Sequence, residues 1–65
     1  MEYLIDKLAQ EFNIRPKQVQ DTVELIDAGN TIPFIARYRK EVTGNLSDVL
    51  LRDLDARLNY LRKLQ

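Results

Sequence analysis

The chain has no cysteine, no histidine and no long apolar run. Without cysteine it can form neither a disulfide nor a thiolate metal site. Without histidine it lacks the commonest metal ligand and the commonest general base. No apolar segment approaches the ~18 residues that span a membrane, and the N-terminus lacks the basic and apolar layout of a signal peptide. These absences predict a cytoplasmic protein that is not an enzyme, holds no cofactor and contacts no membrane.

The 65 residues suffice for one domain with a thin core. A chain of this length buries roughly 60% of the surface that its unfolded form exposes. Ten lysines and arginines balance ten acidic residues. Domains that bind nucleic acid by themselves usually carry a basic excess, because phosphate contacts dominate their affinity. The zero net charge therefore argues against autonomous nucleic-acid binding, although it leaves a local basic patch open.

Apolar residues recur at helical spacing through most of the chain. The pattern predicts a first helix over residues 2–12. A second helix begins at Pro16, which suits a first helical position, and ends before Gly29. A short third helix runs over residues 32–39, with Thr31 as its N-cap.

The last predicted helix is the longest. A turn over residues 42–45 precedes it, and Asn45 or Ser47 caps its N-terminus. Its leucines follow at spacings of 3, 4 and 3, as in a coiled-coil seam: Leu51, Leu54, Leu58 and Leu61. This seam packs against the first two helices, or part of it forms an interface with another part of a longer protein or with a second copy. No capping residue ends the helix before Gln65, which predicts that it continues in a longer protein.

The second and third helices, joined by a short turn, have the outline of a helix-turn-helix. A DNA-binding version presents polar side chains at the start of its second helix. Here Ile32, Pro33 and Phe34 occupy those positions, and they cannot recognise the hydrogen-bonding pattern of a groove. The sequence therefore predicts an all-α fold: a small bundle of about four helices in a single domain over residues 1–65. Its middle is helix-turn-helix-like and its C-terminal helix is long.

One basic cluster encloses an aromatic residue: Arg37, Tyr38, Arg39 and Lys40. Such a cluster can hold phosphates and stack a base, with help from Arg52 or Arg57. Alternatively, Tyr38 anchors the short helix in the core, while Arg37 and Arg39 pair with acids or face a protein. Arginine and tyrosine are enriched at protein interfaces, so a protein contact is favoured over direct nucleic-acid binding.

Residues 31–44 closely resemble a signature near the N-terminus of the Tex family of bacterial transcription accessory proteins. Besides the basic cluster, the residues that carry it are Thr31, Pro33, Phe34, Ile35, Ala36, Glu41, Thr43 and Gly44. Residues 23–29 and 51–62 are also similar to that family, in the same order. The departures are Asn45, where a second glycine is common, and Asn30, where a small residue is often found.

The resemblance implies that this chain is the N-terminal fragment of a multidomain parent. Family members combine a helical region containing a helix-turn-helix with an inactive RNase H-like module, helix-hairpin-helix elements and an OB-fold domain that binds RNA. They are also similar to a eukaryotic elongation factor that binds histones and RNA polymerase. The resemblance thus implies a structural and interaction module that contacts other domains of its parent, while the full-length protein binds RNA or DNA. RNA polymerase and a second copy of the fragment are further partners, and direct contact of the basic cluster with DNA or RNA is the alternative.

Overall fold

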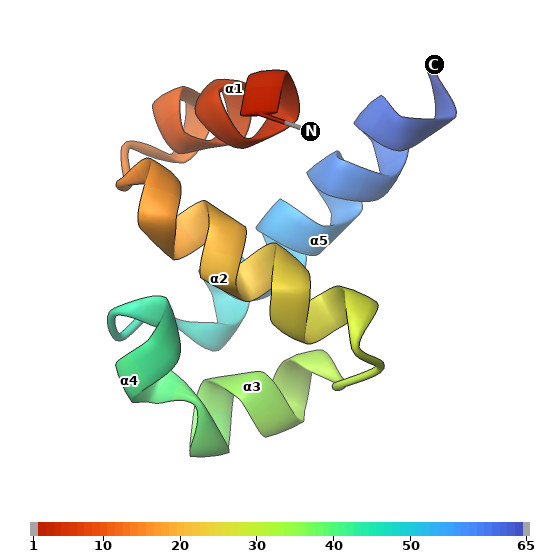
Figure 1. Cartoon of the computed structure of the whole chain (residues 1–65). Helices are drawn as coiled ribbons and strands as arrows, with labels where there is room; N and C mark the ends of the chain where they lie inside the picture. Colours follow the sequence, from red (N-terminus) through yellow and green to blue (C-terminus); the bar gives the residue numbers. More distant parts are fainter. Residues whose placement is uncertain (1, 65) are drawn as a thin grey trace.

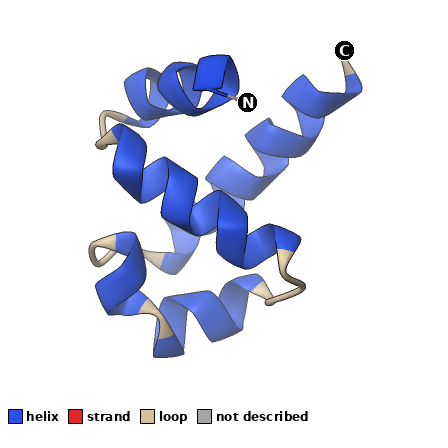
Figure 2. Ribbon diagram, viewed as in Figure 1, coloured by secondary structure: helices blue, strands red, loops and turns tan. Residues whose placement is uncertain are grey.

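The computed structural model describes residues 2–64, and every regular element in them is a helix (Figure 2). The helices are α1 (Glu2–Phe12), α2 (Pro16–Asp27), α3 (Ile32–Tyr38), α4 (Lys40–Thr43) and α5 (Asp48–Lys63). Helix α2 crosses the middle of the molecule, between α1 and the pair α3 and α4, and α5 runs behind it (Figure 1). The predicted all-α fold is confirmed. The part of the α5 prediction that concerns Gln65 lies outside the described residues.

Most helix boundaries have a local chemical cause that the sequence predicts. Pro16 lies in the first turn of α2, and Gly29 follows its end in a left-handed conformation with φ 97°. The Thr31 hydroxyl accepts a hydrogen bond at 3.3 Å from the backbone N–H three residues later, which confirms it as the N-cap of α3. The equivalent bond to Ser47 measures 3.1 Å, so Ser47 rather than Asn45 caps α5.

The predicted turn over residues 42–45 is wrong in its first half. Val42 and Thr43 belong to α4, and the turn is made by Gly44 and Asn45 alone. A helix of four residues has too few positions to show a period in the sequence. Gly44 and Asn45 both have left-handed backbones, with φ 75° and 67°. Since asparagine tolerates this conformation better than most residues, it can stand where the family commonly has a second glycine.

The core consists of two clusters, and α5 contributes to both. The larger cluster joins α1, α2 and α5 through Leu4, Ile5, Leu8, Ala9, Val19, Val23, Leu54, Leu58 and Leu61. The smaller one joins α3 to the start of α5 through Ile35, Leu46 and Leu51. Helix α5 therefore connects the two ends of the bundle.

Gln18 ties α2 to the turn that follows α4. Its side-chain Nε2 donates to the carbonyl oxygens of Thr43 at 3.0 Å and Gly44 at 3.4 Å. Its Oε1 accepts a hydrogen bond from the Arg15 backbone N–H at 2.9 Å. A Cβ atom added at Gly44 would clash with the Gln18 amide. Gly44 is therefore required both for its backbone conformation and for the space that it leaves.

Candidate interaction surface

Arg37, Tyr38, Arg39 and Lys40 lie where α3 meets α4, and we call these four residues the α3–α4 corner. All four are exposed, and Tyr38 retains 61% of its accessible surface. The prediction that Tyr38 anchors α3 in the core is therefore wrong. Ile35, which is fully buried, is the anchor, because it faces Leu46 and Leu51.

The two arginines of the corner stack on aromatic rings. The Arg37 guanidinium lies 6.0 Å from the centre of the Tyr38 ring, and that of Arg39 lies 5.1 Å from the centre of the Phe34 ring. The two rings contact each other, with centres 5.2 Å apart. Among the side chains of residues 3–64 no ion pair joins Arg37, Arg39 or Lys40 to a carboxylate. The prediction that Arg37 and Arg39 pair with acids is thus wrong for the described residues, and the corner presents these charges to solvent.

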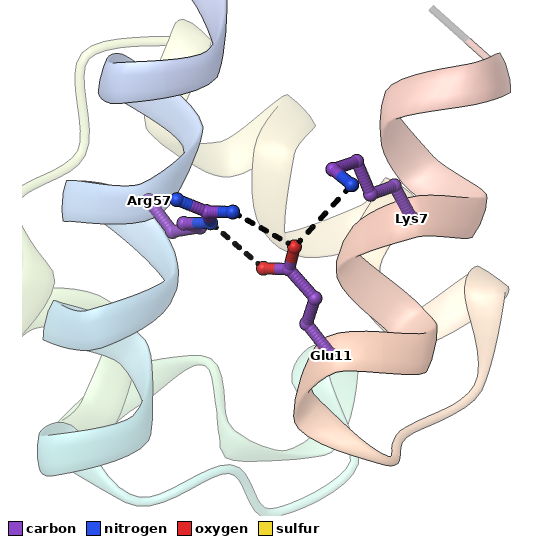
Figure 3. A network of polar contacts seen from close by, with 3 residues as sticks. All are labelled: Lys7, Glu11 and Arg57. Carbon is purple, nitrogen blue, oxygen red and sulfur yellow. Dashed lines mark hydrogen bonds and ion pairs between the residues drawn. The ribbon is translucent and has the colours of Figure 1, made fainter.

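Arg57 and Arg62 behave differently, because each holds a carboxylate of another helix. Arg57 Nε and Nη2 donate to the two carboxylate oxygens of Glu11 at 2.8 and 3.1 Å, and Lys7 Nζ lies 3.7 Å from the same group (Figure 3). Arg62 donates two bonds of 2.9 Å to Asp27. These two pairs, the α5 clamps, connect α5 to α1 and α2. Arg57 is therefore occupied and does not join the corner.

The α5 clamps predict acid-sensitive stability. The hydrogen bonds from Arg57 lower the pKa of Glu11 below its ordinary 4.5, and those from Arg62 lower the pKa of Asp27 below its ordinary 3.8. A carboxyl whose pKa is lower in the folded state stabilises the fold above its unfolded pKa and loses that contribution as pH falls through the folded pKa. We expect the free energy of unfolding, measured with urea, to decrease between neutral pH and about pH 3.

Charge-removing variants test this assignment. Glu11→Gln/Asp27→Asn should lose less stability between neutral and acidic pH than the unaltered chain. The change will be modest, because both clamps remain partly exposed and water screens them. Glu24→Gln/Asp53→Asn removes two exposed acids outside the clamps. This variant should lose as much stability between neutral and acidic pH as the unaltered chain. If both double variants lost the same amount of stability at acidic pH, the clamps would not be the cause of that loss.

An open groove of about 540 Å³ lies beside the corner, between α3, the start of α4 and the start of α5. Arg37, Lys40 and Arg52 all line it. Arg52 also contacts Asp48 at 3.8 Å. The structure therefore places Arg52, but not Arg57, next to the basic cluster. No sequence pattern indicated this choice, because it depends on how α5 returns past α3.

The leucine seam lies inside the domain. Leu51, Leu54 and Leu58 are fully buried and Leu61 is nearly so. The seam therefore packs within the chain, which was the first of its two interpretations. These leucines offer no surface to a partner. The exposed apolar side chains on and after α5 are instead Val49, Tyr60 and Leu64.

The 31–44 signature combines structural residues with an exposed middle. Thr31 caps α3, Ile35 and Thr43 are fully buried, and Gly44 forms the turn after α4. Residues 37–41 are all exposed. The signature thus fixes the backbone on both sides of the corner and leaves the corner free for contacts.

Two further features bear on the kind of site that the chain carries. Among the described side chains, those of residues 3–64, no group of three or more acidic residues is placed to hold a metal ion. The same residues include no helix long and apolar enough to cross a membrane. Neither observation tests for catalysis, so the expectation that the chain is not an enzyme stays a prediction.

Comparison with known proteins identifies the family. The profile of the family described as "Tex-like protein N-terminal domain" matches residues 2–65. Protein YhgF of Escherichia coli (strain K12) is 59% identical over 58 residues, which cover 89% of this chain and 8% of that protein. Transcriptional accessory protein Tex of Neisseria gonorrhoeae is 53% identical over 58 residues, which again cover 89% of this chain and 8% of that protein.

A human protein is also similar. S1 RNA-binding domain-containing protein 1 of Homo sapiens is 39% identical over 59 residues, which cover 91% of this chain and 6% of that protein. The chain thus spans less than a tenth of the length of each of these relatives. The match of the family profile over residues 2–65 and the identity to these relatives show that the chain belongs to the Tex-like protein N-terminal domain family.

Proposed function

We propose that this chain is the helical structural and interaction module of a Tex-like transcription accessory protein, and that the α3–α4 corner is its contact surface. The observation that carries the proposal is the exposure of the corner: three cations without a carboxylate partner in residues 3–64, next to the exposed side chain of Tyr38. Arginine and tyrosine are the residues that most often dominate the energy of protein interfaces. In this proposal the module performs no catalysis and acts in the cytoplasm.

The partner that we propose is another domain of the same parent protein. The chain spans 8% of its bacterial relatives, so a parent of similar length would hold many surfaces within reach of the corner. A domain in the same polypeptide has a high effective concentration, so that even a small contact is occupied. The corner lies at the opposite end of the molecule from the last turn of α5, so a partner on it leaves that turn accessible (Figure 1). RNA polymerase and a second copy of the chain are partners that the same surface can also accept.

Binding in trans tests the proposal. The partner is a Tex-family protein, such as the Neisseria gonorrhoeae relative, from which its own N-terminal domain has been removed. We expect Arg37→Ala/Arg39→Ala to weaken binding of the chain about tenfold or more, because two exposed interface arginines are lost. Unfolding of the variant should be nearly unchanged, since both side chains are on the surface.

The matched control removes two cations elsewhere. Lys17→Ala/Lys63→Ala changes the net charge by the same amount, at two exposed positions on other helices, α2 and α5. It should bind like the unaltered chain. If both double variants lose the same affinity, the attraction depends only on net charge and the corner is not the contact surface.

A second candidate function is direct contact with nucleic acid. The observation that favours it is the same set of free cations, with Arg52 in the neighbouring groove. Titration of the chain with single- and double-stranded DNA and RNA at two salt concentrations separates the candidates. Salt-sensitive micromolar binding that Arg37→Ala/Arg39→Ala abolishes would make nucleic acid a ligand of the corner. Because the chain has no net charge, we expect the full-length protein to bind RNA or DNA mainly through other domains.

A further inference from the structure

The groove beside the corner has an apolar floor and a cationic rim. Pro33 and Ala36 of α3 and Leu46, which lies between the turn and α5, contribute the floor. Arg37, Lys40 and Arg52 come from three different helices and form the rim. A volume of about 540 Å³ accommodates a few side chains of a bound segment. The groove therefore offers two kinds of contact side by side, one for an apolar group and one for an anion.

The charges of the rim are unequal. Asp48 partly neutralises Arg52, since the two groups are 3.8 Å apart. Arg37 and Lys40 have no carboxylate partner among the described side chains of residues 3–64. The rim thus holds an excess of positive charge that is concentrated on the side of α3 and α4. A carboxylate bound beside Arg37 and Lys40 would neutralise part of this excess.

We propose that the groove binds an acidic peptide segment in which a carboxylate side chain adjoins an aliphatic one. The inference rests on the proposed function and names the chemistry of the protein partner. The floor favours a peptide over a nucleic acid, because the sugar–phosphate backbone carries no aliphatic side chain to place on it. Nucleic-acid binding also sums the attraction of many phosphates, which a chain with ten acids and ten bases does not favour. A single carboxylate needs only the local pair of cations.

Short capped peptides test the two contacts separately. The first peptide alternates glutamate and leucine; the second has glutamine for glutamate, and the third has serine for leucine. We expect the first peptide to shift the backbone amide resonances of residues 36–40 and 46–48. The other two should bind about tenfold more weakly, because each lacks one of the two contacts. Equal binding of the second peptide, or of the third, would overturn the proposal, and so would tighter binding of single-stranded oligouridylate at the same residues.

Two neighbouring cations provide a matched pair of variants. Lys40 lines the groove, whereas Arg39 lies outside its lining and stacks on Phe34. Lys40→Ala should weaken binding of the glutamate–leucine peptide about three- to tenfold, whereas Arg39→Ala should weaken it less than about twofold. Equal losses of affinity would mean that binding of the peptide depends only on the overall charge of the corner, and would overturn the proposal.

The two proposals fail differently. If the truncated Tex-family protein still binds at the corner while the glutamate–leucine peptide does not bind, the groove inference falls and the proposed function stands. If the truncated protein does not bind either, the proposed function falls with it.

Discussion

Replacing Leu54 by alanine is expected to destabilise the chain by about 2–5 kcal/mol, because Leu54 is fully buried in the larger core cluster. At about 0.05–0.15 kcal/mol per residue, a chain of 65 residues has only about 3–10 kcal/mol of total stability. The Tm, measured by far-ultraviolet circular dichroism, should fall by at least about 8 °C. A large share of the molecules should be unfolded already at moderate temperature.

Leu64→Ala is the control for this prediction. It deletes the same atoms next to the end of the same helix, but Leu64 retains 66% of its accessible surface. Its effect should stay within about 0.5 kcal/mol. Equal effects of the two substitutions would contradict the assignment of Leu54 to the core.

Gly44→Ala is expected to have the second-largest effect, about 2–3 kcal/mol. An alanine in the left-handed conformation, at φ 75°, costs about 1–2 kcal/mol. The new Cβ also displaces the Gln18 amide, which loses its bonds to the carbonyl oxygens of Thr43 and Gly44. A lost hydrogen bond adds about 1 kcal/mol. Chemical denaturation of the variant measures the sum.

A double-mutant cycle with Gln18→Ala separates the two causes. Without the Gln18 side chain, Gly44→Ala should cost about 1 kcal/mol less than in the unaltered chain, because the clash is gone. Gly29→Ala is the matched control, since its φ is 97° but no atom lies within 4 Å of the added Cβ. Its cost should not depend on Gln18. If Gly44→Ala costs the same with and without Gln18, then the close approach in the structure has no energetic consequence.

Features that depend on neighbouring residues were predictable from the sequence. The apolar period and the capping residues place α1, α2 and the start of α3, and Thr31 and Ser47 cap the helices as local chemistry predicts. Asn30, which departs from the family pattern, donates from its side chain to the Leu25 carbonyl at 2.8 Å and so helps to close α2. These elements need no information about distant residues.

Features that depend on tertiary packing were not predictable. In the sequence Tyr38 was a possible anchor of α3 in the core, but Ile35 is the fully buried residue of that helix. The rings of Phe34 and Tyr38 instead contact each other at a tilt of 45°. The contact between Gln18 and Gly44 joins residues 26 positions apart. The pair of Arg57 and Glu11 joins residues 46 positions apart. A single sequence contains no periodicity that connects such residues.

The candidate site shows the same division. Its four residues were recognised in the sequence because they form a basic cluster that encloses an aromatic residue, and arginine and tyrosine are enriched at protein interfaces. Their exposure and the groove that Arg52 completes arise from the path of α5, which brings its first turns next to α3. The composition of the surface was therefore visible in the sequence, whereas its shape was not.

Amide chemical-shift mapping of the isotope-labelled chain, titrated with a Tex-family protein that lacks its own N-terminal domain, tests most directly whether the α3–α4 corner is the contact surface. The largest shifts are predicted at residues 36–42 and 46–52, with little change in α1, and Arg37→Ala/Arg39→Ala should remove them while the spectrum of the free chain stays folded. Shifts confined to the exposed apolar residues at the end of α5, Tyr60 and Leu64, or no shifts at all, would contradict the proposal.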